Sequence, residues 1–316
     1  MFRGTYLKGT AILWSVMLCV ASAWGQITIT AEDVAPKIGT RTEYWMVTIM
    51  GSMEATGISV GEEGGPHAFN ITAWNPAGEM ISTSVMVSSI LPPHAVPMAA
   101  DFPDADYVLY MEMRFSPPMG GPEEESDYYL FMRREPAGDV MLGSSDPNIP
   151  APSSQTQEET SIYPLTLGKE WEFTMSLSDL GMATLEGVAM EGSLTTRGSA
   201  DAWGTAITLA RNFEVLRTVQ TLEGTMSFSV GSGGGEMPIL SEGYEWIAKE
   251  LGLVASVQEI RMGPMQGVPE LSEEIVITEV MWLTGFSEID VEAMMPVQAA
   301  TWGQIKGTFR SRSFPR

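Results

Sequence analysis

Apolar and polar residues alternate with period two along several stretches of this chain. The clearest lies within residues 198–220, where Ile207 and Leu209 and then Phe213 are separated by polar or small residues. Such alternation is typical of β-strands with one buried face. Ala210-Arg211-Asn212 lies between the two runs, and Asn tolerates the left-handed backbone of a tight connection. We therefore predict two strands joined as a hairpin.

Similar runs recur along the chain between turns rich in Gly and Pro, and a helical period of apolar residues is not sustained over a full window. A Gly-rich stretch, 231–235, is predicted to be a loop. The pattern predicts an all-β protein with an antiparallel curved sheet and little helix. The predicted strands lie near residues 42–50, 66–74, 80–90, 106–115, 127–134, 171–177, 182–196, 205–210, 213–222, 224–230, 244–249, 253–261 and 274–284.

Domain boundaries follow from shifts in composition. A Pro-rich segment, 143–160, interrupts the strand pattern and is predicted to be a loop or a linker. If it is a loop, one β domain spans 26–284; if it is a linker, two β domains span 26–142 and 161–284. In both cases we expect a signal peptide over 1–25 and a C-terminal segment with a basic tail over 285–316.

The N-terminus has the three parts of a secretory signal. Arg3 and Lys8 precede an apolar run over 11–20, and Ala21-Ser22-Ala23 supplies the small residues that signal peptidase requires. The run is shorter than the ~20 residues of a membrane-spanning helix. We therefore predict no stable membrane span and a protein that is secreted or periplasmic.

Cysteine content and charge exclude several function classes. Cys19 is the only cysteine and lies inside the predicted signal, so the mature chain has no disulfide, thiolate metal site or catalytic thiol. Removing Arg3 and Lys8 from the 17 basic residues leaves 15 against 40 acidic ones. Such a balance disfavours nucleic acid, which is bound by neutralising its phosphates with Lys and Arg. We predict no nucleic-acid partner.

Catalytic motifs are weak. Gly57-Ile-Ser59-Val-Gly61 fits the G-x-S-x-G nucleophile pattern, but Glu62-Glu-Gly-Gly-Pro66 follows where that motif requires a helix. The chain has only two histidines, His67 and His94, both beside or near prolines in predicted turn regions and neither spaced like a pair of zinc ligands. We predict that the protein is not an enzyme and has no cofactor and no metal.

Acidic residues leave two alternatives open. Asp101, Asp104 and Asp106, or the run 123–127, could gather a calcium ion, although neither has the spacing of an EF-hand loop, and solvated loops explain both. Two facing carboxylates could also form a hydrolase site. The sequence does not locate such a pair.

Three segments carry a family resemblance. Gly204-Thr205, Phe213 and Leu216-Arg217, together with segments 163–173 and 244–254, resemble motifs of uncharacterised secreted β-rich proteins of Gram-negative bacteria. The Pro-x-Gly turn of that group is replaced here by Ala210-Arg211-Asn212. The resemblance implies a fold related to lipid-carrier-like half-barrels and implies no activity.

Methionine is the unusual component, with 23 in 316 residues. Thioethers are soft Cu(I) ligands, but they are more often adaptable fillers of cores and of apolar pockets. Several strands, such as 44–50 and 107–111, are apolar on both faces, so either a second sheet (a sandwich) or an apolar cavity (a half-barrel) must cover them. For a cavity, the candidate ligand-binding residues are Met46, Met111, Met113, Trp171 and Trp246.

We therefore expect a secreted, non-catalytic envelope protein whose partner is an apolar or lipid-like small molecule or an envelope component. A structural or adhesive cell-surface component and a carboxylate-based hydrolase are the alternatives. The large side chains of the central strands are predicted to share one core, because burial of apolar area is the main stabilising contribution available without disulfides. These are Trp171, Phe173, Trp203, Phe213, Leu216 and Trp246.

Overall fold

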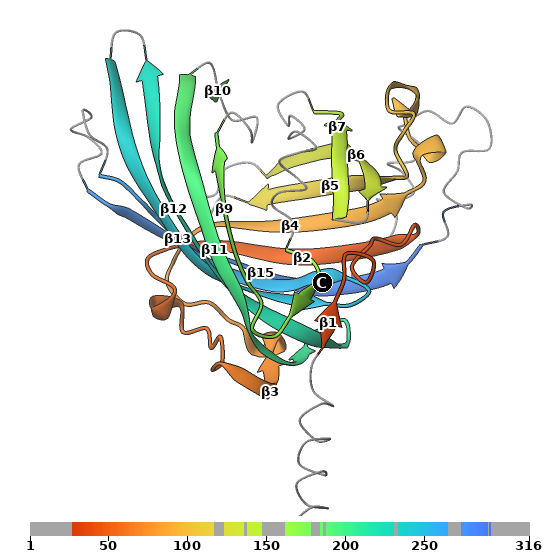
Figure 1. Ribbon diagram of the computed structural model, residues 1–316, viewed down its shortest axis with the longest axis horizontal. Helices are drawn as coiled ribbons and strands as arrows, with labels where there is room; N and C mark the ends of the chain where they lie inside the picture. Colours follow the sequence, from red (N-terminus) through yellow and green to blue (C-terminus); the bar gives the residue numbers. More distant parts are fainter. Residues whose placement is uncertain are drawn as a thin grey trace, which may run out of the picture.

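The protein is built around one large curved β-sheet that does not close into a barrel (Figure 1). The computed structural model describes residues 27–116, 123–135, 138–146, 162–177, 184–185, 188–230, 233–264, 273–289 and 291. The helices of this part of the chain are short 3-10 turns, and none is long and apolar enough to cross a membrane. The all-β prediction is confirmed.

The main sheet has the strand order β10-β11-β12-β13-β14-β15-β2-β4-β5-β6-β7, with β3 and β9 both paired to β11. The pairing is antiparallel except between β3 and β11, which are parallel. Strands from both halves of the chain thus form one continuous sheet, because β15 pairs with β2. Its strands are β2 (Thr40–Met50), β3 (Gly64–Asn70), β4 (Glu79–Leu91), β5 (Tyr107–Ser116), β6 (Glu124–Glu135), β7 (Gly138–Ser144), β9 (Glu170–Ser176), β10 (Thr184–Leu185), β11 (Val188–Ile207), β12 (Asn212–Val230), β13 (Gly233–Ala248), β14 (Gly252–Met262) and β15 (Ile275–Glu288).

A second, two-stranded sheet pairs β1 (Thr28–Ile29) with β8 (Leu165–Thr166). Four three-residue 3-10 helices lie in the connections between strands of the first half. They are η1 (Glu54–Thr56), η2 (Ile71–Ala73), η3 (Pro93–Ala95) and η4 (Ala99–Asp101).

The predicted hairpin is confirmed as the junction of β11 and β12, which pair along almost their whole length. Thr208 organises the connection, because its Oγ1 donates a hydrogen bond to the carbonyl oxygen of Arg211 (2.7 Å) and accepts one from the N–H of Ala210 (3.2 Å). The two strands are 20 and 19 residues long. Each therefore unites two of the shorter strands predicted from the sequence.

Part of the predicted Gly-rich loop is strand. Gly233, Gly234 and Gly235 begin β13 and pair with the end of β12, whereas 231–232 lie outside the described residues. Backbone hydrogen bonding to β12 decides the conformation here, since glycine has no side chain that opposes it. The predicted signal peptide, residues 147–160 of the Pro-rich segment and the basic tail also lie outside the described residues.

The two faces of the sheet have different neighbours. Leu216 and Ile247 pack against Ile29 of β1 and Leu165 of β8, and we call this face the inner face. Trp246 points to the opposite, outer face, because neighbouring residues of a strand alternate between faces. There it packs edge-on against Phe69 and Trp74, with ring centroids 5.7 and 5.1 Å away. The outer face around Trp246 is therefore covered by the excursion between β2 and β4.

The prediction of one shared core is wrong. Phe213 and Trp246 belong to the largest buried cluster, whereas Leu216, with Trp171 and Trp203 beside it, belongs to the cluster under β1 and β8. Phe173 is half-buried and lies in neither cluster. The strands were interpreted correctly, but Leu216 and its neighbour Val215 point to opposite faces of one sheet and so reach different clusters.

Candidate functional site

Four methionines gather on the inner face where the two halves of the chain meet. Met46 of β2 pairs with Met281 of β15, and Met86 of β4 pairs with Met113 of β5. Tyr44 links the two pairs, since it pairs with Met86 and lies two residues from Met46 on the same face. All four methionines are half-buried. We call Met46, Met86, Met113 and Met281 the methionine wall.

The methionine wall belongs to the inner face by an unbroken series of strand pairings. Ala200, which packs under β1 and β8, starts a row that crosses the sheet from β11 to β5. Directly paired residues share a face, so every member of this row projects inward. The row is Ala200, Thr218, Glu245, Ser256, Met281, Met46, Ser84 and Phe115.

The structure brings together only part of the predicted ligand-binding set. Met46 and Met113 lie on the methionine wall, and Met111 is on the same face of β5 but buried. Trp171 lies apart from them, in the cluster under β1 and β8, with its ring against Gly198. Trp246 is fully buried in the largest core cluster and offers no surface to a ligand.

A carboxyl group that sequence reasoning missed lies in the same row. Glu245 is half-buried on the inner face of β13, and its Oε2 accepts a hydrogen bond from Nε2 of Gln220 on β12 (2.8 Å). Burial raises the pKa of Glu245, and the hydrogen bond from Gln220 opposes that rise. The only signal in the sequence is an acid that interrupts the run Tyr244-Glu245-Trp246, which reads equally well as a solvated position.

Two further polar residues, Tyr163 and Asp139, lie on the inner side of the sheet with Glu245. The pKa of Tyr163 is raised to about 12. Burial is the largest cause, and the charges of Glu245 and Asp139 add to it. Glu245 belongs to β13 and Asp139 to β7, at the far end of the sheet order. Both acids act on the phenol of Tyr163, which lies two residues before β8. The curved sheet places its two arms around a common interior (Figure 1).

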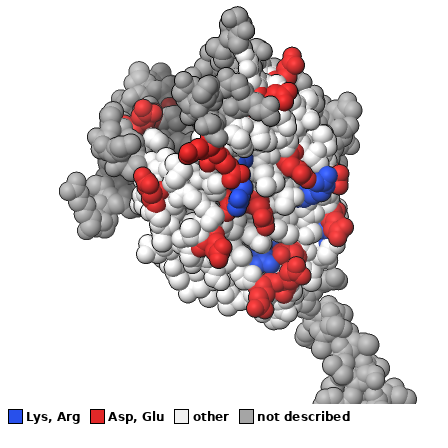
Figure 2. All heavy atoms as spheres, turned by 90° about the vertical axis from the view of Figure 1, so that its left-hand side faces the viewer, with Lys and Arg blue, Asp and Glu red and all other residues white. Residues whose placement is uncertain are grey.

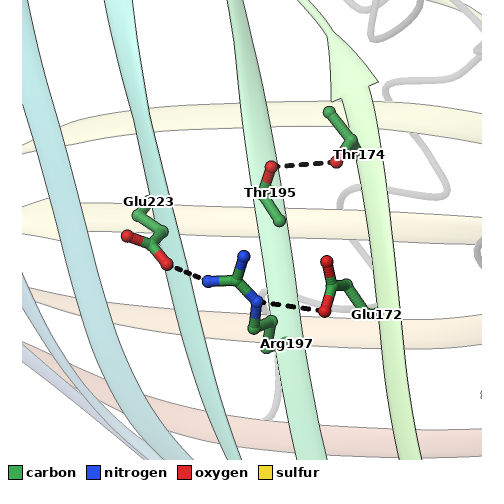
Figure 3. Close-up of polar contacts among 5 residues, drawn as sticks. All are labelled: Glu172, Thr174, Thr195, Arg197 and Glu223. Atoms are coloured by element: carbon green, nitrogen blue, oxygen red, sulfur yellow. Dashed lines mark hydrogen bonds and ion pairs between the residues drawn. The ribbon is translucent and has the colours of Figure 1, made fainter.

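The outer face of β9, β11 and β12 carries a solvated ion-pair cluster. Arg197 of β11 binds Glu172 of β9, with Nε to Oε2 at 3.1 Å, and also Glu223 of β12. Thr174 and Thr195 share a hydrogen bond of 2.8 Å beside them (Figure 3). The side of the molecule that these strands form shows acidic side chains interspersed with a few basic ones (Figure 2). Both carboxylates here are already paired with a cation, which is unlike the two free facing acids of a hydrolase.

A cavity of about 390 Å³ lies beside the excursion between β2 and β4. Ser59 of the G-x-S-x-G pattern and His67 both line it, although no hydrogen bond between these two side chains occurs in the described part of the chain. A nucleophile and its base require that contact. Within the same described part, no group of three His, Cys, Asp or Glu side chains could hold a metal ion.

Comparisons with known proteins give two distant structural similarities. No family model and no curated protein matches the chain. A putative lipoprotein from Parabacteroides distasonis is 10% identical, with a TM-score of 0.31, over 82% of this chain and 99% of its own. A putative exported protein with a YmcC-like fold from Bacteroides fragilis is 10% identical, with a TM-score of 0.29, over 83% of this chain and 100% of its own. At these TM-scores, neither similarity carries an argument about this chain.

Proposed function

We propose that this chain is an exported, non-catalytic envelope protein that binds an apolar or lipid-like molecule along the methionine wall. The observation that carries the proposal is the pairing of Met46 with Met281 and of Met86 with Met113 on one face. Four thioether side chains on four neighbouring strands give this face an apolar patch, and their flexibility lets it adapt to ligands of different shape.

Burial and curvature support the proposal. Each methionine of the wall keeps part of its surface exposed in the described structure, whereas Leu283 and Val280 are fully buried. Met86 and Met281 pack against the cluster that contains those two residues, so the wall borders the close-packed core and keeps an apolar surface beside it. The sheet curves around the inner face without closing. An apolar surface on the concave side of an open sheet can admit an elongated molecule from its edge.

The test is native mass spectrometry of the full-length gene product, expressed with its own N-terminus and extracted gently from the envelope fraction. We expect a mature mass that begins at Trp24 or Gln26, and an additional mass that is lost on activation in the instrument. A chain that retains residues 1–23 would contradict export through a cleaved signal.

The same preparation, stripped of lipid, is then titrated with a fluorescent fatty amphiphile. We expect saturable binding that weakens in the double variant Met46→Gln, Met281→Gln and is unchanged in Met98→Gln. Met98 is exposed in the loop between β4 and β5 and serves as the control. If no mass co-purifies and no saturable binding occurs, the carrier function is wrong, and the structural or adhesive alternative takes its place.

A further inference from the structure

We infer that the bound amphiphile has a neutral or cationic head that donates hydrogen bonds to Glu245, while its apolar tail lies on the methionine wall. This inference rests on the proposed function and adds to it the chemical class of the ligand. It is carried by the position of Glu245 in the same inner row as Met281 and Met46.

The spacing within the row suits one amphiphilic molecule. Neighbouring strands lie about 4.8 Å apart, so Met281 is about 10 Å from Glu245 and Met46 about 14 Å from it. Ser256 is the residue between Glu245 and Met281, and its small side chain leaves the path along the row open. A polar head at Glu245 therefore places the first part of a tail against Met281 and the next part against Met46.

The polar groups of the inner face determine which head group of the amphiphile can bind. Gln220, beside Glu245, uses its amide to donate to Oε2, so the carboxyl still has acceptor capacity on its other oxygen. Glu279 lies on the inner face one row away, and Asp139 is near enough to act on Tyr163. These carboxyl groups disfavour an anionic head, because like charges in a half-buried site repel each other and lose hydration.

Three of the described cations are already engaged. Lys169 donates from Nζ to the carbonyl oxygen of Ile162 (2.7 Å), and Lys249 pairs with Asp33 (3.5 Å). Arg134 donates to the carbonyl oxygen of Pro36 and lies 3.6 Å from Asp139. A carboxylate or phosphate head would have to share a cation with one of these partners, whereas an amine, an amide or a hydroxyl group can use the acceptors that the site presents.

The test compares three amphiphiles that share a twelve-carbon tail: dodecylamine, dodecanamide and dodecanoate. Each displaces the fluorescent probe from the full mature chain at neutral pH, below its micelle concentration. We expect the amine and the amide to bind at least about tenfold more tightly than the anion, the scale of one charge-assisted hydrogen bond. In Glu245→Gln the preference for the amine over dodecanoate should shrink, while in Glu242→Gln, an exposed residue on the outer face of the same strand, it should persist.

The outcomes separate the two proposals. Equal binding of all three molecules, or a preference for dodecanoate, overturns the assignment of the head and leaves the carrier function intact. Absence of binding by all three overturns both. The wild-type ranking decides the point even if the variant does not fold, and circular dichroism of Glu245→Gln shows whether its result can be compared.

Discussion

Two arginines on neighbouring strands show how burial changes the contribution of an ion pair to stability. Arg217 is almost fully buried, donates to both carboxylate oxygens of Asp201 (3.0 and 2.6 Å), and also donates to the carbonyl oxygens of Val60 and Gly61. Arg197 has similar partners in Glu172 and Glu223 but is solvated. Arg217 thereby fastens the segment that leads into β3 to the sheet.

We predict that Arg217→Ala lowers the free energy of unfolding by about 3–5 kcal/mol, because Asp201 is left as an uncompensated, largely buried charge. Arg197→Ala should hardly move the urea midpoint, since water screens its two ion pairs. Equilibrium urea denaturation of both variants checks the contrast. Equal midpoints for the two variants would mean that the Asp201 pair is not buried in solution.

Glu245 should make stability depend on pH. Burial raises its pKa above the ordinary value of 4.5, so the folded chain holds the proton more tightly than the unfolded chain. The resulting stabilisation is complete below pH 4.5 and is lost as the pH rises through the folded-state pKa. The difference in unfolding free energy between wild type and Glu245→Gln should therefore fall as pH increases from 4.5 toward neutrality. Chemical denaturation across this range measures it, and a flat difference would contradict burial of this carboxyl.

At the scale of strands, glycine marks close approach of backbones in this sheet. A Cβ at Gly204 of β11 would lie 2.0 Å from the carbonyl oxygen of His67 on β3, and one at Gly198 would lie 2.4 Å from the ring of Trp171. The parallel pairing of β3 with β11 thus depends on the absence of a side chain at position 204.

We predict that Gly204→Ala displaces β3 and destabilises the fold, whereas Gly285→Ala in β15 is mild. At Gly285 the nearest atom is Cβ of Glu43, 3.2 Å from the added Cβ, and a shift of a few tenths of an ångström relieves that contact, whereas the backbone clash at Gly204 is far closer. Thermal denaturation compares the two variants. If Gly204→Ala has the same melting temperature as the wild type, β3 does not pair with β11 as described.

The same glycines explain where sequence reasoning failed. Period-two alternation predicted the strands and the hairpin at Ala210-Arg211-Asn212, because those are local properties. The prediction divided β11 and β12 into shorter strands, with breaks that contain Gly198 and Gly204 or adjoin Gly224. Their backbones stay paired throughout, and glycine there serves close packing instead of turning.

The site was predictable only in part for a related reason. Met111 and Met113 share a face by spacing alone, which the sequence reveals. The partners Met281 and Glu245 depend on the register of β15 with β2 and of β13 with β14, and pairing between distant segments leaves no local pattern. Trp246 was predicted to bind the ligand, but large aromatic residues line pockets and also fill cores. In this structure Trp246 is part of the core.

For the whole molecule, the order of strands is what produces a common interior. The chain begins and ends its main sheet at β2 and β15, which pair with each other in the middle of the sheet. The two arms, β10–β14 and β4–β7, extend from that centre and curve (Figure 1). The methionine wall lies at the centre of the inner face, and the ion pairs of Arg197 lie on the outer face of one arm. The net charge of −23 over the whole sequence favours solubility.

The most direct measurement of ligand binding at the wall is NMR of protein labelled with carbon-13 at the methionine methyl groups. Resonances are assigned through single Met→Leu variants, and dodecanamide is titrated into the mature chain. We predict saturable shifts of the Met46, Met86, Met113 and Met281 methyl signals, with Met98 unchanged. Saturable shifts confined to other methionines, or no saturable shift at all, would contradict a ligand on the inner face.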